Sequence, residues 1–540
     1  MYKRCVILFG FFMFLFCMAF FSIDYLSDKE TLYDAALNQQ NYNLKIANIR
    51  GTIYDCRNIP LVNTEKKFIA AAVPCTESLT ALTPVVSDDK KEELYKKCSK
   101  NTPFTIEVNS RVNSPYIKVF EVPIRYSGIT PAAHIIGYIS GDKKGLCGIE
   151  KIYDEYLSGN NHDIYVKYCV DASGKILPGK KEFIEDKSYL KSKGVVLNID
   201  SRIQAIVEEA ANKYITRGAV IVSEIPECEI RACSSLPGFL PGNVAPYLND
   251  KNSPLLNRIM CSFNLGSVFK IVTSAAALEG GISENTLYDC RGFNKVEDAC
   301  FKCFNSKKHE TVNMEQALAH SCNGYFIELI KKMPYNALLN MARKFKLGES
   351  VSLAPGMNSD KGTLPSEESL KNIKTLANFS FGQGKLMATP LQVTGIINTI
   401  ASGGIYSNPK LIKGLTDESM KITKKDIVSP KRERIISEST AKKLKSHMKA
   451  SIDYGTSERG KPEKTDAAAK TSTAQTGIIE DGKKIEQSWF AGFFPYENPK
   501  YSIVILSEAG SGGGESCGPV FKEITDRIIS EIPELFIDKN

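Results

Sequence analysis

Residues 266–278 read Gly-Ser-Val-Phe-Lys-Ile-Val-Thr-Ser-Ala-Ala-Ala-Leu, and a glycine pair follows at 280–281. This composition predicts a helix that stops at the glycines. The segment is apolar almost all round, so we expect the helix to be buried. Ser267 and Lys270 are three positions apart and share one helical face. Burying an ammonium is costly, so Lys270 has either a chemical role or a side chain that reaches back to solvent.

The chemical role follows from two later patterns. A lysine whose pKa is lowered by burial can take the proton of a neighbouring serine, which makes that serine a nucleophile without a histidine. Ser321-Cys322-Asn323 then lies between apolar helical segments, and Lys470-Thr471-Ser472-Thr473 lies in a strand-like string. The ordered set Ser-x-x-Lys, Ser-x-Asn and Lys-Thr-small is typical of penicillin-binding proteins and serine β-lactamases.

Further strings extend the resemblance over nearly the whole chain, which is similar to a class B penicillin-binding protein, a peptidoglycan D,D-transpeptidase. The pattern of cysteines described below is similar to that of clostridial and sporulation-type members. The strings that carry the resemblance are Arg50–Asp55, Gly148–Asp154, Val196–Asp200, Gly382–Gly384, Ala388–Gln392 and Trp489–Pro495.

The resemblance implies a role for each motif residue. Ser267 would attack the carbonyl between two D-alanines, and Lys270 would accept its proton. Ser321 would relay a proton to the leaving amine, and Asn323 would orient the substrate and Lys270. The strand motif would bind the substrate carboxylate through Lys470, Thr471 and Thr473, with Ser472 in the same substrate-binding strand. The N–H groups of Ser267 and Thr473 would form the oxyanion hole.

Two positions depart from the family pattern. Ser472 stands where the family usually has glycine, which lets substrate approach a strand closely. We therefore expect the Ser472 side chain to narrow the cleft or to alter β-lactam affinity. Leu265 stands where many relatives have proline, a change at the start of the helix. Neither departure removes a catalytic group.

The resemblance also implies the architecture: an α/β (α+β) transpeptidase fold with an antiparallel sheet flanked by helices. Composition changes near Gly194, so we predict a membrane-proximal, mostly β pedestal domain at 25–200 and the transpeptidase domain at 201–540. β-Rich strings predict the hairpin that starts the sheet at Ala219–Ile225 and Glu229–Ser235, and the strands that complete it at Ala467–Thr476, Ser488–Pro495 and Tyr501–Glu508.

The N-terminus (residues 1–24) predicts a membrane anchor. Cys5–Ile23 carries no charge, Lys3 and Arg4 precede it, and Asp24 follows it. This length can span a bilayer, and the flanking charges put the N-terminus in the cytoplasm and the rest of the chain outside. A cleaved signal peptide is the alternative, but Met18-Ala19-Phe20 is a poor cleavage site.

A cluster of cysteines suggests a metal site beside the catalytic motifs. Cys290, Cys300, Cys303 and His309 have spacing typical of zinc ligands. Either Asp289 or Cys322 could replace one of them. A Cys300–Cys303 or Cys290–Cys303 disulfide and unlinked thiols are the alternatives, and Cys322 also fits a small buried filler. No cofactor is expected to be required for the chemistry itself.

Partners follow from the resemblance and from charge. Expected ligands are peptidoglycan stem peptides and β-lactams, and a separate glycosyltransferase partner is implied because no such domain is visible before residue 200. A net charge of +8 from 69 basic and 61 acidic residues is too mild to indicate nucleic-acid binding. The alternatives to a transpeptidase are a β-lactam sensor, a non-catalytic cell-wall scaffold and a β-lactamase-like hydrolase.

Overall fold

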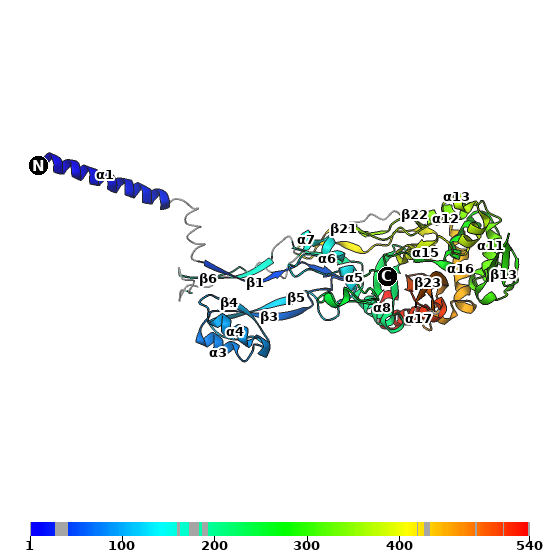
Figure 1. The fold of residues 1–540 in the computed structure, drawn as a ribbon, viewed down its shortest axis with the longest axis horizontal. Coiled ribbons are helices and arrows are strands. Elements are labelled where there is room, and N and C mark those ends of the chain that lie inside the picture. Colours follow the sequence, from blue (N-terminus) through cyan, green and yellow to red (C-terminus); the bar gives the residue numbers. More distant parts are fainter. Residues whose placement is uncertain are drawn as a thin grey trace. The chain divides into compact units, whose positions relative to one another are not determined.

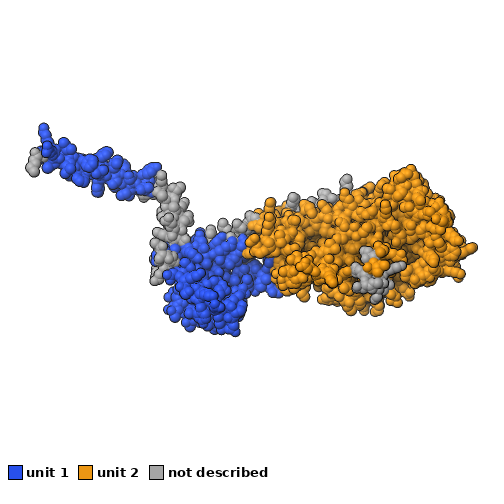
Figure 2. Space-filling model, viewed as in Figure 1, with its two compact units in different colours: residues 1–50, 63–125, 160–192 blue, residues 51–62, 126–159, 193–540 orange. Residues whose placement is uncertain are grey.

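The chain forms two compact units in the computed structural model (Figure 2). Unit 1 comprises residues 1–50, 63–125 and 160–192, and unit 2 comprises residues 51–62, 126–159 and 193–540. The structure describes residues 2–27, 41–158, 162–171, 176, 183–185, 193–417, 419–425, 432–480, 483–510 and 512–537.

A five-stranded antiparallel sheet lies at the centre of unit 2, in the order β10-β9-β25-β24-β23. Along β9, Ala219 and Ile221 belong to one hydrophobic cluster, whereas Val220 and Val222 belong to another. Both faces of the sheet are therefore covered. The predicted hairpin and C-terminal strands are confirmed as β9 (Gly218–Glu224), β10 (Glu229–Leu236), β23 (Ala468–Glu480), β24 (Lys483–Phe494) and β25 (Tyr501–Ser507).

Helices cover the two faces of this sheet (Figure 1). On one face, α8 (Ser201–Tyr214) and α17 (Gly518–Glu531) pack against the apolar side chains of β9, β24 and β25. The other face carries the larger cluster, to which α9 (Lys270–Glu279), α15 (Pro390–Ala401) and α16 (Glu438–Tyr454) contribute. The predicted antiparallel sheet flanked by helices is confirmed.

The helix predicted from residues 266–278 begins one turn later than its sequence pattern predicts. Gly266–Phe269 forms a 3₁₀ turn (η4), and α9 then runs from Lys270 to the predicted glycine stop. Side chains from Lys270 to Ala277 are buried, as expected. The other helices of unit 2 are α5 (Ala133–Ile136), α6 (Gly148–Ile152), α7 (Asp154–Ser158), α10 (Met314–Ala319), α11 (Asn323–Ile330), α12 (Ala337–Lys344), α13 (Glu367–Leu370) and α14 (Ile373–Ser380).

Smaller sheets complete unit 2. One contains β2 (Thr52–Tyr54), β8 (Gly194–Leu197), β20 (Ile412–Thr416) and β21 (Ile422–Lys425). Between α9 and α10, two short ribbons are formed by β12 (Tyr288–Cys290) with β15 (Glu310–Val312), and by β13 (Phe293–Val296) with β14 (Ala299–Lys302). The two-residue strands pair as β11 (Phe263–Asn264) with β18 (Met387–Ala388), β19 (Ile405–Tyr406) with β22 (Glu433–Arg434), and β16 (Ser352–Ala354) with β17 (Met357–Asn358).

Beyond its N-terminal helix, unit 1 is mostly β, and the pedestal domain at 25–200 stays a prediction. Its core includes Ala70, Leu82, Leu94 and Phe104. One of its sheets contains β1 (Asn41–Ile49), β6 (His162–Cys169) and β7 (Phe183–Glu185), in that order. The other contains β4 (Phe104–Val108), β3 (Glu65–Ala72) and β5 (Ile117–Ile124), in that order. Two short helices, α3 (Thr76–Leu82) and α4 (Lys91–Cys98), also belong to this unit.

The N-terminal helix α1 (Tyr2–Ser27) is long and apolar enough to cross a membrane. Its segment Tyr2–Leu26 has a mean hydropathy of 2.6 and is not buried by the rest of the protein. Both features fit a single membrane anchor.

Candidate active site

The turn that carries Ser267 is built by two glycines. Gly266 has φ +60°, in the left-handed region that favours glycine, and its N–H donates to the Gly382 carbonyl at 3.0 Å. A Cβ on Gly382 would collide with the Gly266 carbonyl. The turn therefore requires glycine at both positions, and it leaves Ser267 partly exposed at the start of α9.

Lys270 lies at the centre of a hydrogen-bonded group. Its Nζ lies 3.1 Å from Ser267 Oγ, 3.0 Å from Ser321 Oγ and 2.8 Å from the Ser321 carbonyl. The fourth contact, at 2.7 Å, is to Asn323 Oδ1. The structure thus brings together four of the five predicted catalytic residues around one nitrogen. The alternative, a lysine that reaches back to solvent, is wrong because the side chain is fully buried.

A neutral amine can also make these four contacts. An ammonium has three N–H donors, whereas a neutral amine has two donors and one lone pair. The two shortest contacts are to carbonyl oxygens, of Ser321 and Asn323, which can only accept. Two N–H donors satisfy them, and the lone pair is left to accept from a serine hydroxyl. Burial lowers the pKa of Lys270 to about 8, which makes the neutral form accessible near neutral pH.

Ser321 is held in an uncommon backbone conformation. Its φ is 58°, in the left-handed region that residues other than glycine rarely adopt. It lies between the end of α10 and the start of α11, where its N–H donates to the Leu318 carbonyl at 3.2 Å. This conformation lets both its carbonyl and its hydroxyl contact Lys270.

Lys470, the fifth predicted catalytic residue, lies on β23 and is fully buried. Its Nζ donates to Thr456 Oγ1 at 3.2 Å and to the Thr471 carbonyl at 2.9 Å. Burial, and then the charge of Lys270, lower its pKa. Thr471 donates to Thr456 Oγ1 at 2.7 Å, and Thr473 Oγ1 accepts from the N–H of Gly513 at 3.3 Å.

Thr456 is a residue that the sequence did not single out. Its hydroxyl accepts from Lys470 and Thr471, and its N–H donates to the Ala319 carbonyl at 3.0 Å. It therefore connects the strand that carries Lys470 to the segment before Ser321. No spacing rule marks a lone threonine after a helix, so only the tertiary structure identifies it.

The Ser472 side chain does not point into the cleft. It is 2% exposed, and its Oγ donates to the Leu265 carbonyl at 2.8 Å. The expectation that Ser472 narrows the cleft is wrong, because its side chain turns beneath the nucleophile turn. Leu265 is itself buried and lies directly before η4.

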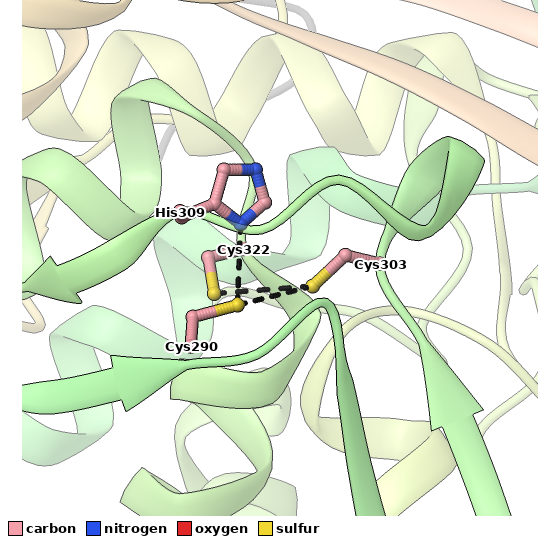
Figure 3. Close-up of side chains that lie close together, drawn as sticks. All are labelled: Cys290, Cys303, His309 and Cys322. Atoms are coloured by element: carbon pink, nitrogen blue, oxygen red, sulfur yellow. Dashed lines mark hydrogen bonds between the residues drawn. The ribbon is translucent and has the colours of Figure 1, made fainter.

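A second group of side chains lies beside these residues (Figure 3). Its ligand atoms, from Cys290, Cys303, His309 and Cys322, all lie within 4.8 Å of one another. Cys303 Sγ is 3.7 Å from Cys290 Sγ and 4.0 Å from Cys322 Sγ, and Cys290 Sγ is 3.4 Å from His309 Nδ1. A hydrogen bond from Cys322 lowers the pKa of the Cys303 thiol.

Three of the four predicted ligands are in this group, and Cys300 is not. Cys300 lies on β14, where residues alternate between exposed and half-buried, and its side chain is exposed. Cys322 takes the fourth position, which the sequence had left as an alternative. All fifteen cysteines lie in the described ranges and are free thiols, so neither alternative disulfide is present.

The spacing of the group fits a tetrahedral zinc ion. Zn–S bonds of about 2.3 Å and a Zn–N bond of about 2.0–2.1 Å at tetrahedral angles separate two sulfurs by about 3.8 Å, and a sulfur from a nitrogen by about 3.5 Å. The observed separations of 3.7, 4.0 and 3.4 Å are close to these values. Three thiols and one imidazole also match the donor set of closed structural zinc sites.

The two groups share a short stretch of chain. Cys322 lies between Ser321 and Asn323, directly before the first residue of α11, and its side chain makes no capping hydrogen bond to that helix. In addition, Asn323 Nδ2 donates to the Lys302 carbonyl at 2.9 Å, directly before Cys303. Both hydrogen-bonding ends of the Asn323 amide are thus fixed, one by Lys270 and the other by the hairpin that carries a thiol of the group.

Comparison with known proteins agrees with this geometry. The family described as "Penicillin binding protein transpeptidase domain" matches residues 218–526, more than half of the chain. The chain belongs to this family. The predicted class B penicillin-binding protein and its transpeptidase activity are thereby confirmed at the level of the family.

Relatives of this penicillin-binding transpeptidase cover most of its length. It is 27% identical to "Stage V sporulation protein D" of Bacillus subtilis, over 94% of this chain and 81% of the relative. It is 29% identical to "Peptidoglycan D,D-transpeptidase FtsI" of Buchnera aphidicola, over 74% of this chain and 68% of the relative. These matches extend beyond the transpeptidase domain to the N-terminal region.

Solved structures share the fold. Penicillin-binding protein 3 of Mycobacterium tuberculosis, in complex with aztreonam, has a TM-score of 0.66 at 22% identity and covers 91% of this chain and 97% of its own. The Helicobacter pylori PBP2 complex with MreC gives a chain with a TM-score of 0.65 at 21% identity, covering 91% and 99%.

Proposed function

We propose that this protein is a serine D,D-transpeptidase that cross-links peptidoglycan stem peptides through an acyl-enzyme on Ser267, and that β-lactams inhibit it by acylating the same residue. One observation carries the proposal: the buried Lys270 Nζ lies 3.1 Å from Ser267 Oγ while Ser321 and Asn323 hold it in place. A base of lowered pKa within hydrogen-bonding reach is what a serine nucleophile needs.

In the acylation step, Ser267 Oγ bonds to the carbonyl carbon between the two D-alanines. Its proton passes to the lone pair of neutral Lys270. The carbonyl oxygen becomes an oxyanion, which the N–H groups of Ser267 and Thr473 stabilise. When the intermediate collapses, the C–N bond breaks and the terminal D-alanine leaves as an amine, with a proton that Lys270 returns through the Ser321 hydroxyl.

The second half of the reaction reverses these roles. The amine of another stem attacks the ester carbonyl, a new amide forms, and Ser267 leaves with a proton. Lys470, in its protonated form, would supply positive charge to the substrate carboxylate, and this negative charge in turn stabilises the ammonium. The hydroxyls of Thr471 and Thr473 would bind the same carboxylate, and Thr471 would first turn its hydroxyl hydrogen away from Thr456 Oγ1. The N–H of Gly513 occupies a lone pair of Thr473 Oγ1, so the Thr473 hydroxyl hydrogen is available for the carboxylate.

The thiol and imidazole group is proposed to hold a structural zinc ion. Cys290, Cys303, His309 and Cys322 would be its ligands, and the ion would serve to cross-link the chain. Because Cys303 follows Lys302 and Cys322 lies inside the Ser-x-Asn motif, this cross-link would fix both Ser321 and Asn323. The chemical steps themselves use no cofactor.

Membrane topology is the remaining part of the proposal. Helix α1 is proposed to anchor the chain with its N-terminus in the cytoplasm and the transpeptidase domain outside, because Lys3 and Arg4 precede the apolar segment and Asp24 follows it. A separate glycosyltransferase is proposed to supply the glycan strands that carry the stems.

Covalent labelling tests the proposed function. The full-length protein in detergent is expected to form a stoichiometric adduct with a fluorescent penicillin, and peptide mapping by mass spectrometry is expected to find the adduct on Ser267. An adduct on another residue, or none, would contradict the proposal.

Turnover separates the transpeptidase from its alternatives. A stem peptide that ends in D-Ala-D-Ala is expected to release D-alanine and to form a cross-linked product with an acceptor amine. Acylation by penicillin without release of D-alanine would indicate the β-lactam sensor. Rapid hydrolysis of the penicillin adduct would indicate the β-lactamase-like hydrolase.

The pH dependence of acylation follows from the lowered pKa of Lys270. The second-order rate constant for acylation is expected to rise about tenfold per pH unit below about 8 and to level off above it, because only the neutral amine accepts the serine proton. Stopped-flow labelling at a series of pH values measures this. A rate that is constant between pH 6 and pH 9 would exclude Lys270 as the base that titrates.

A further inference from the structure

The third residue of the strand motif makes a contact that the proposed mechanism does not use. Ser472 Oγ donates to the Leu265 carbonyl at 2.8 Å, and both residues are buried. The contact joins β23 to a residue only two positions before the nucleophile. A buried carbonyl that lost this partner would pay its full desolvation cost.

The backbone before Ser267 is held at four polar groups of the three consecutive residues 264–266. Asn264 N–H donates to Gln487 Oε1 at 2.7 Å, and the Asn264 carbonyl accepts from Trp489 Nε1 at 2.8 Å. The Leu265 carbonyl accepts from Ser472, and the Gly266 N–H donates to Gly382. Ser472 and Trp489 are paired across β23 and β24, so neighbouring side chains of the sheet hold successive carbonyls.

Packing around Gly266 shows how closely Ser472 fits. A Cβ added to Gly266 would collide with Ser472 Oγ, so the hydroxyl fills the space beside the residue that precedes the nucleophile. Without that hydroxyl, Ala474 would remain as the neighbour of Gly266 on β23, and the space that Ser472 Oγ fills would be empty. Ser472 is therefore both a hydrogen-bond donor and a spacer beneath the turn.

We propose that Ser472 is a positioning residue for the transpeptidase reaction: its hydroxyl fixes the Leu265 carbonyl, and so holds Ser267 in register with Thr473, the next residue on β23. This inference rests on the proposed function. Ser267 and Thr473 are the two proposed oxyanion donors, and Ser472 links the segments that carry them. A small error in their spacing weakens the stabilisation of both tetrahedral intermediates.

Kinetics of Ser472→Ala and Ser472→Gly in the full-length protein test the inference. Both variants are expected to lower the rate constants of acylation by benzylpenicillin and of deacylation, each by about tenfold, because one oxyanion hole serves both steps. The dissociation constant of the complex that precedes acylation is expected to stay within twofold, and the pH midpoint of acylation is expected not to move, since Lys270 keeps its contacts.

Ser502→Ala is the matched control. Ser502 is also buried on the sheet, and its hydroxyl is bonded to Ser223 Oγ at 2.6 Å on strands away from the nucleophile. It is expected to lower the melting temperature about as much as Ser472→Ala and to leave both rate constants unchanged. Rate constants within twofold of wild type in the Ser472 variants, or an equal loss in Ser502→Ala, would overturn the inference. A wild-type protein that penicillin does not acylate would instead contradict the proposed function.

Discussion

Replacing Lys270 with methionine is expected to slow acylation by penicillin about 10³-fold, within the range that general bases contribute. Methionine has a similar length and keeps the buried site filled, but it offers no lone pair of comparable basicity to the Ser267 hydroxyl. The contacts of Nζ with Ser321 and Asn323 are lost at the same time. The remaining rate is expected to lose its rise with pH, since the titrating amine is gone.

A half-buried lysine elsewhere in unit 2 supplies the control. Lys445 lies over the rings of Phe493 and Tyr496, and burial lowers its pKa as well. The rate constant for acylation of Lys445→Met by penicillin is expected to lie within about twofold of the wild-type value. Should Lys270→Met acylate at the wild-type rate, the base is another group, and Lys470 is the next amine to test. The stopped-flow assay used for the pH series measures both variants.

Loss of the metal site is expected to give the largest change in stability. The purified full-length protein is expected to contain one zinc ion per chain, and Cys303→Ser to contain none. Metal present at a thousand times its Kd stabilises the folded state by about 4 kcal/mol. An unfolding entropy of about 2.1 cal/mol/K per residue gives roughly 1 °C in Tm per kcal/mol for a unit as large as unit 2, so the variant is expected to melt about 5 °C lower. Elemental analysis and thermal unfolding measure the two effects.

This variant is also expected to acylate more slowly at temperatures well below its Tm. Lys302, whose carbonyl accepts from Asn323 Nδ2, is adjacent to Cys303, so release of the hairpin frees one end of the Asn323 amide. A chelator added to the wild-type protein is expected to reproduce both the lower Tm and the slower acylation.

Cys300→Ser is the matched control for this prediction. It changes an exposed cysteine on the same hairpin, three residues away, and is expected to leave zinc content, Tm and acylation unchanged. Loss of zinc in Cys300→Ser, or full zinc content in Cys303→Ser, would contradict the ligand set that the structure brings together. A wild-type protein without zinc, even after purification with zinc present, would contradict the metal site itself.

Local patterns were enough to predict the scaffold. The short, β-branched apolar runs at 219–225 and 501–508 predict strands, and the glycine pair after Leu278 predicts the end of a helix; the structure has both within one or two residues. These signals depend on neighbours in sequence, because a strand covered on both faces needs a continuous apolar run and a helix ends at glycine. The same patterns did not show that Ser267 lies on a 3₁₀ turn, since that turn depends on the distant Gly382.

By itself, the sequence determined the family and the candidate catalytic residues, because three spaced motifs in a fixed order are specific even when each is weak. Only the tertiary structure decided how two ambiguous side chains, Cys322 and Ser472, and one that the sequence did not single out, Thr456, are used. Cys322 rather than Cys300 completes the thiol group, Ser472 turns beneath the nucleophile rather than into the cleft, and Thr456 joins two motif segments. In each case the outcome depends on which face of an element meets a segment far away in the chain. Spacing along the sequence carries no information about which distant segments pack against each other, whereas the tertiary structure shows this directly.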